Sequence, residues 1–402
     1  MTITRRRFLQ GAASVAGASA LPASAQPAAS PSPTPDAGQL RGGEILPNPD
    51  FSLVRESDPY LIGIRPHRKG GVRLEVEPRG DKFVIHNYGT GGAGITLSWG
   101  CASVVVDHVE SVTSQLRAKE KSPSVAILGT GVMGLTAATE IRRKWPELPI
   151  TIYAKDLDLK STVSFIAGGQ FEPSGIHHEY NSDAKRKVLA TYLRRARDRI
   201  VEIQKSGDRL LYGIAERKNY TLDHELRSMD VATPRDVIPA HRKGRLPFAK
   251  LNAAGREYST WLMNPSILLP KLVADLNAGG VTFEQRAFAT AAEVLALPAN
   301  VIVNCTGYGA KALFGDDKLV AQRGHNIVLQ KTDPKQFYFF SGGCENSVIA
   351  YVFCRQDDIV VGGTVQSGQD SLARTPEDDK TFKRLLANAG QLFDGHPSAC
   401  QW

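Results

Sequence analysis

The fold follows from one short segment, Ser124-Val-Ala-Ile-Leu-Gly-Thr-Gly-Val-Met-Gly-Leu135. It opens on an apolar run without polar alternation, which is typical of a strand buried in a parallel sheet. Glycines with the spacing G-x-G-x-x-G follow, and a helical pattern comes after them. A second apolar run occupies residues 150–153, after Pro146. This order of strand, glycines, helix and strand is the context in which such glycines bind a dinucleotide, so it predicts a doubly wound α/β domain.

The glycines of this motif have separate physical roles. Gly129 permits the tight turn, Gly131 lets the backbone approach a pyrophosphate, and Gly134 lets the helix pack close to the strand. Val132 and Met133 begin the helix, whose free N–H groups and partial positive charge attract phosphate. We therefore expect these residues to form the pyrophosphate end of a cofactor site.

The end of the second strand departs from the usual pattern. An acidic residue there would hold a ribose hydroxyl. In this sequence Lys155 stands at that place and Asp156 follows it. Either Asp156 binds the ribose from a shifted register, or Lys155 contacts a phosphate. The identity of the nucleotide therefore rests on other segments.

Three further segments are rich in glycine. Residues 301–307 form a buried strand that ends in Thr-Gly, where backbone can approach a cofactor. Residues 84–100 indicate a strand, a glycine loop and the start of a helix that extends from about residue 95 to residue 117. The glycines at this helix start would bring backbone N–H groups onto an electron-rich edge of a bound ring. Residues 359–364 are strand-like and rich in glycine.

The composition is that of an ordinary globular protein. The chain has 402 residues, of which 42% are hydrophobic and 22% charged, and its length predicts two or three domains. The net charge of +8 suits an anionic ligand. The basic residues form no stripe with interleaved aromatics, so a nucleic-acid role has almost no support. The five cysteines show neither a CxxC spacing nor a paired histidine, so no metal site is indicated.

The N-terminus predicts an export signal. Residues 5–9 (Arg-Arg-Arg-Phe-Leu) precede a mild apolar stretch, and residues 23–25 (Ala-Ser-Ala) supply a cleavage pattern. The arginine pair is similar to a twin-arginine signal over residues 1–25, the route that exports folded proteins. We therefore expect the Tat translocon as a partner, a periplasmic or secreted protein, and a cofactor loaded before export. Residues 26–57 follow as a linker rich in Pro, Ala and Ser.

Together these segments resemble D-amino-acid oxidase and its relatives among the FAD-dependent oxidoreductases. The matching pieces are residues 63–66, 84–100, 124–135, 301–307, 351–355 and 361–366. The resemblance covers most of the chain from about residue 58. It implies a Rossmann-like domain that binds FAD non-covalently and a second, mixed-sheet substrate domain.

The order of the pieces differs from that family. There the Arg-Pro segment and the His-Asn-Tyr-Gly loop close the chain, whereas here residues 61–100 precede the glycine motif. The sequence is therefore interpreted as a circular permutant, cut between residues 393 and 58 and joined anew near residues 120–124. The resulting domains are a permuted segment at 58–122, an FAD-binding domain at 123–178 and 290–325, and a substrate domain at 179–289 and 326–402.

The resemblance implies a substrate site. Arg65 matches the arginine that holds the substrate carboxylate, and Tyr351 matches a tyrosine that hydrogen-bonds the same group. Gly92 would accept the substrate amine through its carbonyl. Glu172 stands where a pocket glutamine is expected, and Ser347 replaces a second pocket tyrosine, so the preferred side chain of the substrate is left open.

It also implies a flavin site, in addition to the glycine motif and Asp156. The expected contacts are Gly91, Gly94, Ile95 and Thr96 at the helix start, Ser161, Thr162, Gly168 and Gly169 in a second flavin segment, and Thr306, Gly307 and Tyr308 after the strand at 301–304.

The implied activity is oxidative deamination of D-amino acids to 2-oxo acids and ammonia. Hydride passes from the substrate Cα to flavin, so no catalytic base is expected, and oxygen or another acceptor such as a quinone reoxidises the flavin. Two alternatives remain open: a glycine- or sarcosine-type secondary-amine oxidase or dehydrogenase, and a flavin-binding protein without turnover. A homodimer is also left open.

Overall fold

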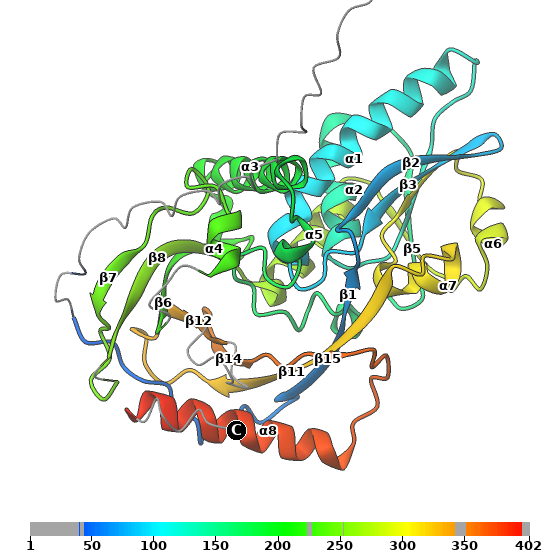
Figure 1. Cartoon of the computed structure of the whole chain (residues 1–402). Helices are drawn as coiled ribbons and strands as arrows, with labels where there is room; N and C mark the ends of the chain where they lie inside the picture. The colour runs from blue at the N-terminus through cyan, green and yellow to red at the C-terminus, as the bar shows by residue number, and fades with distance from the viewer. Residues whose placement is uncertain (1–39, 41–43, 223–226, 252, 342–350, 396–402) are drawn as a thin grey trace, which may run out of the picture. The chain divides into compact units, whose positions relative to one another are not determined.

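The computed structural model describes residues 40, 44–222, 227–251, 253–341 and 351–395 (Figure 1). Several parts on which predictions were made lie outside the described residues: the signal peptide at 1–25, the linker residues 26–39 and 41–43, Ser347, and the tail from residue 396.

A six-stranded sheet contains the strand of the glycine motif (Figure 1). Its order is β2 (Arg73–Arg79), β3 (Lys82–Tyr88), β10 (Val301–Asn304), β4 (Val125–Leu128), β5 (Ile150–Ala154) and β9 (Thr282–Gln285). Five of these strands are parallel, and β2 is antiparallel to β3. Helix α2 (Val132–Lys144) connects β4 to β5, so the predicted strand–glycine–helix–strand unit is confirmed. Strand β9 falls in the range 179–289 that was assigned to the substrate domain, yet it pairs with β5.

A nine-stranded, mostly antiparallel sheet forms the second part of the fold. Its order is β1 (Tyr60–Arg68), β11 (Leu319–Gln330), β14 (Asp358–Gly362), β13 (Tyr351–Cys354), β12 (Tyr338–Ser341), β6 (Ile214–Thr221), β8 (Ala254–Met263) and β7 (Arg242–Arg245), and β15 (Gln366–Ser367) pairs with β11. Strand β1 is antiparallel to β11, with Arg65 opposite Gln322. The segment from 60 to 117 therefore supplies strands to both sheets.

Helix α1 (Gly94–Arg117) confirms the helix predicted from about residue 95 to residue 117. Most of its apolar side chains, including Trp99 and Val105, are buried. It crosses α3 (Asp183–Lys205) closely at Gly100, where an added Cβ would lie 1.9 Å from the carbonyl oxygen of Tyr192. The other helices of the described residues are α4 (Ser228–Ala232), α5 (Pro265–Ala278), α6 (Ala291–Leu295), α7 (Ala310–Phe314) and α8 (Pro376–Phe393). Within the described residues, no helix has the length and apolarity that crossing a membrane requires.

Helix α8 packs along the nine-stranded sheet (Figure 1). Thr375 caps its N-terminus, and Asp378 completes a capping box. The same Asp378 carboxylate binds Arg323 of β11 at 2.6 Å, and this bond holds the pKa of Asp378 well below its usual range. The helix is thus fixed to the sheet by a buried ion pair.

The later part of the predicted linker belongs to the folded body. Val54 forms a β-bridge to Leu329, and the rings of Phe51 and Phe393 lie 5.6 Å apart. The bias toward Pro, Ala and Ser ends before residue 44, and the apolar side chains after it can be buried. Composition therefore predicts a linker only up to that point.

Three cysteines of the described residues, Cys101, Cys305 and Cys354, are buried free thiols. Burial raises the pKa of Cys305 and that of Cys354 to about 12, and it raises the pKa of Cys101 as well. These thiols therefore stay protonated at neutral pH.

Candidate active site

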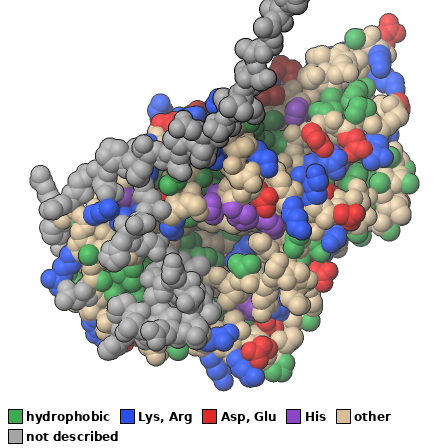
Figure 2. Space-filling view, in the orientation of Figure 1, with side chains coloured by type: hydrophobic (Ala, Val, Ile, Leu, Met, Phe, Trp, Pro, Cys, Tyr) green, Lys and Arg blue, Asp and Glu red, His purple; other side chains and the backbone are tan. Residues whose placement is uncertain are grey.

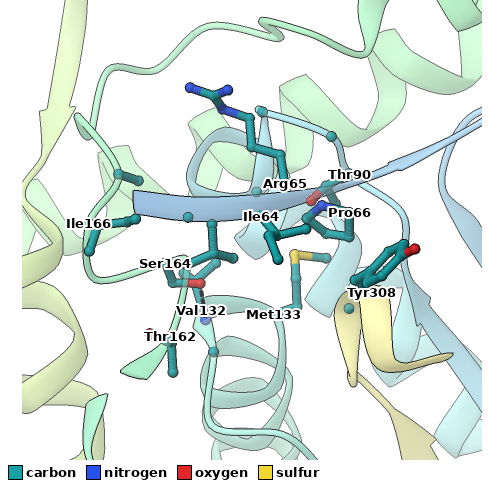
Figure 3. A pocket seen from close by; sticks show the side chains of 18 of the residues that line it. Ile64, Arg65, Pro66, Thr90, Val132, Met133, Thr162, Ser164, Ile166 and Tyr308 are labelled. Atoms are coloured by element: carbon teal, nitrogen blue, oxygen red, sulfur yellow. Dashed lines mark hydrogen bonds between the residues drawn. The ribbon is translucent and has the colours of Figure 1, made fainter. Parts of the chain in front are cut away.

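A cavity of about 910 Å³ lies where elements of both sheets meet. All of the predicted cofactor and substrate residues line it except Gly134 and Thr96. Figure 3 shows Ile64 and Arg65 leaving opposite faces of β1, with Ile64 pointing toward Met133 at the start of α2. The cavity is at the upper end of the volumes that small-molecule and cofactor sites occupy, about 300–1,000 Å³.

The start of α2 forms one wall of the cavity. Gly129 has a φ of +104°, and a Cβ there would lie 2.7 Å from the carbonyl oxygen of Cys305. Gly131 is the N-cap residue, without a side-chain cap, and the Val132 N–H donates to Ser164 Oγ at 3.0 Å. A helix end of this kind presents backbone N–H groups and a partial positive charge, as a pyrophosphate requires.

Gly134 acts one turn further along the helix and does not line the cavity. A Cβ at this position would lie 2.0 Å from the carbonyl oxygen of Gly129, so only glycine lets α2 come this close to the turn. Its role is the packing that the sequence motif predicts, rather than a contact with a ligand.

The glycine loop before α1 forms a second wall. Gly91 has a φ of +56°, and its N–H donates to the carbonyl of Pro66 at 3.0 Å. Gly94 and Ile95, in the first turn of α1, line the cavity, and no side chain caps this helix start. The Thr96 side chain does not line the cavity. It is buried, and its hydroxyl donates to the carbonyl of Glu172 at 2.7 Å. Thr96 thus ties α1 to the segment that carries Glu172.

Most of residues 161–169, which contain the second flavin segment, and the residues at the end of β5 line another part of the cavity wall. The hydroxyls of Ser161 and Thr162 both donate to backbone carbonyls of their own turn, at 2.7 Å. One Asp156 oxygen accepts from the Asp158 N–H at 2.9 Å, and the residue is half-buried at the cavity wall. Lys155 also lines the cavity and is exposed. Both candidates for the ribose or phosphate contact are therefore adjacent to the space.

Arg65 and Tyr351 face one small space. Arg65 Nη1 donates to the carbonyl of Thr364 at 2.8 Å, and the Tyr351 hydroxyl donates to Asn326 Oδ1 at 2.6 Å. A Cβ added to Gly363 would lie 3.0 Å from Arg65 Nη2 and 3.0 Å from Tyr351 Oη. Only glycine fits this closely against both groups, and the guanidinium and the phenol, which also line the cavity, lie near enough to each other for a small carboxylate to contact both.

Glu172 lies in a buried charge cluster that the sequence did not predict. Its Oε1 accepts from Arg227 Nη2 at 3.0 Å, and the same nitrogen donates to Asp230 Oδ1 at 2.8 Å. Burial raises the pKa of Glu172 to about 7, although the Arg227 charge opposes the rise. Burial also acts to raise the pKa of Asp230, but the hydrogen bonds from Arg227 outweigh it and hold that pKa below its usual range.

Several further residues that line the cavity carried no sequence signal. They include Ser164, His177, Arg227 and Asn326. Asn326 lies in β11 and Arg227 precedes the short helix α4, so only the folded chain brings them to Tyr351 and Glu172.

The comparisons with known proteins agree with this geometry. A profile of the family described as FAD dependent oxidoreductase (DAO) matches residues 124–401. D-aspartate oxidase 2 of Caenorhabditis elegans is 25% identical over 278 residues, which are 66% of this chain and 77% of that protein. D-aspartate oxidase of Homo sapiens is 25% identical over 279 residues, covering 69% and 77%. D-aspartate oxidase of Cryptococcus neoformans var. grubii is 54% identical over 61 residues, 15% of each chain.

Solved structures show similarity at lower identity. Iminodiacetate oxidase from Chelativorans sp. BNC1 has 15% identity and a TM-score of 0.48, over 67% of this chain and 80% of that one. Glycine oxidase from Bacillus cereus ATCC 14579 has 13% identity and a TM-score of 0.47, over 69% and 79%.

The residues present fit FAD. Two helix starts without side-chain caps border one cavity of dinucleotide size, and at Gly129 a side chain would collide with neighbouring backbone. The family match covers more than half of the chain, including this glycine motif. The chain therefore belongs to the FAD-dependent oxidoreductases of the DAO family.

Proposed function

We propose that the protein oxidises D-amino acids to 2-oxo acids and ammonia, with molecular oxygen and water as co-substrates and hydrogen peroxide as the second product. The observation that carries the proposal is the closeness of Arg65 Nη2 and Tyr351 Oη, each 3.0 Å from the point where a Gly363 Cβ would stand. Both groups line the cavity that fits FAD, and together they suit an α-carboxylate. Bound FAD would supply the two-electron acceptor for the amine.

The chain's own residues would bind and orient the substrate. Arg65 is held by the carbonyl of Thr364, so its guanidinium is fixed before a carboxylate arrives. Gly92 is adjacent, because a Cβ there would lie 3.6 Å from Arg65 Cδ. A substrate whose carboxylate is bound to Arg65 would have its amine near this loop. With both groups fixed, two directions remain at the α-carbon. The enantiomer that reacts would be the one whose Cα–H takes the direction toward the flavin and whose side chain takes the other.

The test is an Arg65→Leu variant, with Arg79→Leu as a matched control on exposed strand β2. Flavin content is read from the visible spectrum, and turnover from oxygen uptake with D-alanine, L-alanine and sarcosine. We expect Arg65→Leu to retain flavin while kcat/KM for D-alanine falls roughly 100- to 1,000-fold, because a charged hydrogen bond to the carboxylate is lost. Unchanged turnover in Arg65→Leu would refute the proposal, as would faster oxidation of sarcosine or L-alanine than of D-alanine.

We also propose that the chain is a circular permutation of the family's order. The family match begins at residue 124, yet β1, the glycine loop and the start of α1, all before that residue, line the cavity. The segment near residue 50 and the end of α8 are neighbours, since Asn48 Nδ2 donates to the carbonyl of Phe393 at 3.0 Å. New chain ends placed between these two segments would leave most of the packing of the fold in place.

Export through the Tat translocon to the periplasm remains a proposal, supported by the arginine pair, apolar stretch and cleavage pattern of residues 1–25. Loss of export in an Arg5→Lys, Arg6→Lys variant, measured by cell fractionation, is the expected result.

A further inference from the structure

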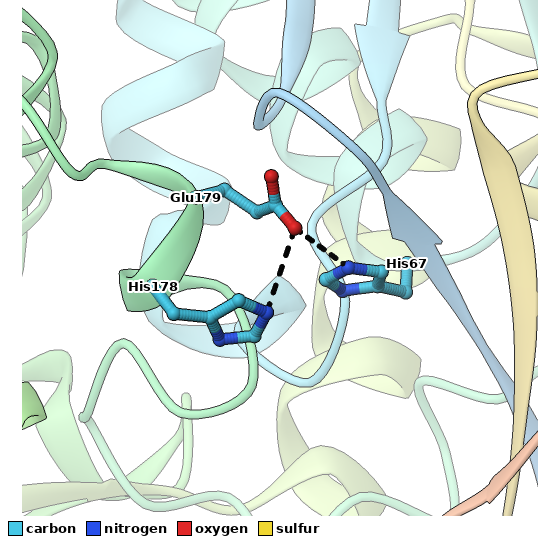
Figure 4. Close-up of side chains that lie close together, drawn as sticks. All are labelled: His67, His178 and Glu179. Carbon is cyan, nitrogen blue, oxygen red and sulfur yellow. Dashed lines mark hydrogen bonds and ion pairs between the residues drawn. The ribbon is translucent and has the colours of Figure 1, made fainter.

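Three side chains of the types that bind metals lie close together next to the glycine loop, and none of them lines the cavity. His67 lies near the end of β1, and His178 and Glu179 lie in the short 3-10 turn His177–Glu179. Figure 4 shows both imidazoles directed at the Glu179 carboxylate. Glu179 Oε1 is 3.0 Å from His67 Nε2 and 3.5 Å from His178 Nε2. The three ligand atoms all lie within 4.8 Å of one another.

The hydrogen bond of His67 determines which of its nitrogens is free. His67 Nδ1 is 3.2 Å from the carbonyl oxygen of Gly175, which can only accept, so Nδ1 carries the proton. In the neutral ring Nε2 then presents a lone pair to Glu179 Oε1, itself an acceptor, at 3.0 Å. Two acceptors at this distance repel unless a proton or a cation lies between them.

Hydrogen bonds to neighbouring backbone groups orient His67 and Glu179, as such hydrogen bonds orient the side chains that bind a metal ion. The Gly70 N–H donates to the second Glu179 oxygen at 2.6 Å, which leaves Oε1 directed at the histidines. The Gly175 carbonyl fixes the tautomer of His67. Histidine ligands commonly donate their other ring N–H to a backbone carbonyl, and ligating carboxylates are themselves hydrogen-bonded.

The two arginines beside His67 in β1 are engaged elsewhere. Arg68 Nε binds Asp316 at 2.8 Å, and Arg65 Nη1 donates to the carbonyl of Thr364. The rings of His67 and His178 are stacked, with centroids 5.2 Å apart and an interplanar angle of 20°. The side chain of His178 is 53% exposed, which gives a metal ion a route from solvent, and Figure 2 shows histidine side chains at the surface in the middle of this face of the molecule.

We propose that His67 Nε2, His178 Nε2 and Glu179 Oε1 bind a divalent transition-metal ion, with zinc as the best match. Zinc bonds of 2.0–2.1 Å in a tetrahedron place ligand atoms about 3.3 Å apart. The two separations that involve Glu179 Oε1, 3.0 and 3.5 Å, lie on either side of that value, and all three ligand atoms lie within 4.8 Å of one another. Two histidines and a carboxylate are a set that zinc accepts, with water in the fourth position. The sequence indicated no metal site, because residues 67 and 178 are far apart in the chain.

The metal would link two segments that border the cavity. His67 is two residues from Arg65 in β1, and the turn with His178 follows the segment of Glu172. The inference nevertheless does not rest on the proposed function, since zinc binding is measured without turnover.

The experiment uses the flavin-loaded protein without a polyhistidine tag, stripped with EDTA and titrated with zinc chloride by calorimetry. Zinc retained after gel filtration is measured by elemental analysis. We expect one zinc ion per chain. His178→Ala should weaken binding at least 100-fold, and His178→Cys should restore it, because cysteine is also a zinc ligand. His178 is exposed, so unchanged flavin absorbance in His178→Ala will show that the fold is intact.

His177→Ala is the matched control, because it removes the neighbouring imidazole of the same turn, whose Nε2 contacts Ser228 Oγ at 2.9 Å. It should keep its zinc. Absence of a saturable one-to-one site in the unaltered protein would overturn the proposal, and so would equal zinc binding by the unaltered protein and His178→Ala. The contact between His67 and Glu179 would then be a proton-mediated ion pair.

Discussion

Glu172 and Arg227 set the charge at one end of the cavity. Arg227 Nη2 lies 3.0 Å from the Glu172 carboxylate and 2.8 Å from that of Asp230. Its positive charge is therefore compensated before any substrate binds. A substrate side chain that reaches this end would meet a balanced cluster instead of a free cation, which disfavours an acidic side chain.

Glu172→Gln should therefore change the substrate preference. Removing the carboxylate takes one acidic partner away from Arg227, so we expect the ratio of kcat/KM for D-aspartate to that for D-alanine to rise about tenfold. Oxygen uptake with the two substrates measures it. Glu140→Gln is the control, because Glu140 is also buried between arginines, Arg143 at 2.6 Å and Arg199 at 2.8 Å, outside the cavity lining. An equal ratio in both variants would exclude a role of Glu172 in specificity.

The same carboxyl group predicts a pH dependence of stability. Burial raises the pKa of Glu172 to about 7 in the folded protein, from an ordinary value of 4.5. As pH rises from about 4.5 to about 7, the unfolded chain releases this proton first, so the group's contribution to the free energy of unfolding falls, by up to about 3 kcal/mol. The melting temperature of the unaltered protein should decrease relative to that of Glu172→Gln across this range. A constant difference between the two would contradict the assignment.

Local sequence predicts residues whose role is local. Gly129, Gly131 and Gly134 were expected from their spacing alone, because the turn and the helix start are formed by neighbouring residues. Arg227 gave no such signal. Its role depends on Glu172, 55 residues earlier in the chain, and on Asp230 in a helix of five residues. Nothing in a short window of sequence distinguishes it from a surface arginine.

At the scale of elements, strong apolar patterns were predicted and mixed ones were not. The helix α1 and the strands β4, β5 and β10 were confirmed, because each has a regular apolar face or core. The charged composition of residues 179–250 predicts helices at first and loops after them, and the second part of this prediction is wrong, because the segment contains β6 and β7. Strand β6 hides its pattern, since Arg217 is buried in it, with its guanidinium over the ring of Phe337.

The crossing of α1 and α3 provides a prediction at this scale. Alanine in a helix interior is normally about 1 kcal/mol better than glycine. At Gly100 the added methyl would lie 1.9 Å from the Tyr192 carbonyl oxygen, and the helices must separate. We expect Gly100→Ala to lower the free energy of unfolding by roughly 1–3 kcal/mol in urea. Ser114→Ala, at an exposed position of α1, should change it by less than about 0.5 kcal/mol. A higher free energy of unfolding in Gly100→Ala would show that the close approach of α3 does not exclude a methyl group at this position.

For the whole molecule, the cavity depends on contacts between distant parts of the chain. Arg65 and the carbonyl that holds it, that of Thr364, are 299 residues apart. The strand order β3-β10-β4 likewise places residues from three separated segments side by side. Sequence motifs identify Arg65 and the segment of Gly363, but packing and register decide which strands pair, so the contact of Asn326 with Tyr351 was found only in the structure.

The proposed permutation is tested by reversing it. A chain that starts at residue 123, runs to residue 395, continues through a short Gly-Ser linker into residue 44 and ends at residue 120 should fold and bind flavin. The reason is that Asn48 and Phe51 already contact Phe393 at the new joint. Flavin absorbance and urea unfolding measure the outcome, with a loss of stability of about 2 kcal/mol at most.

The control chain joins residue 395 to residue 44 in the same way, but its new ends lie inside strand β11, between residues 324 and 325. This cut breaks a central strand and should give no flavin-bound protein. Equal behaviour of both chains, folded or not, would show that the connection near residues 120–124 has no special tolerance.

The buried thiols have a consequence for the working lifetime of the protein. The proposed reaction releases hydrogen peroxide into a cavity that Cys305 lines. Peroxide attacks the thiolate form of cysteine, and burial raises the pKa of this thiol to about 12, so almost none is ionised at neutral pH. Cys101 and Cys354 are buried and protonated in the same way. These three side chains are thus shielded from the oxidant made beside them, and self-inactivation would have to begin elsewhere.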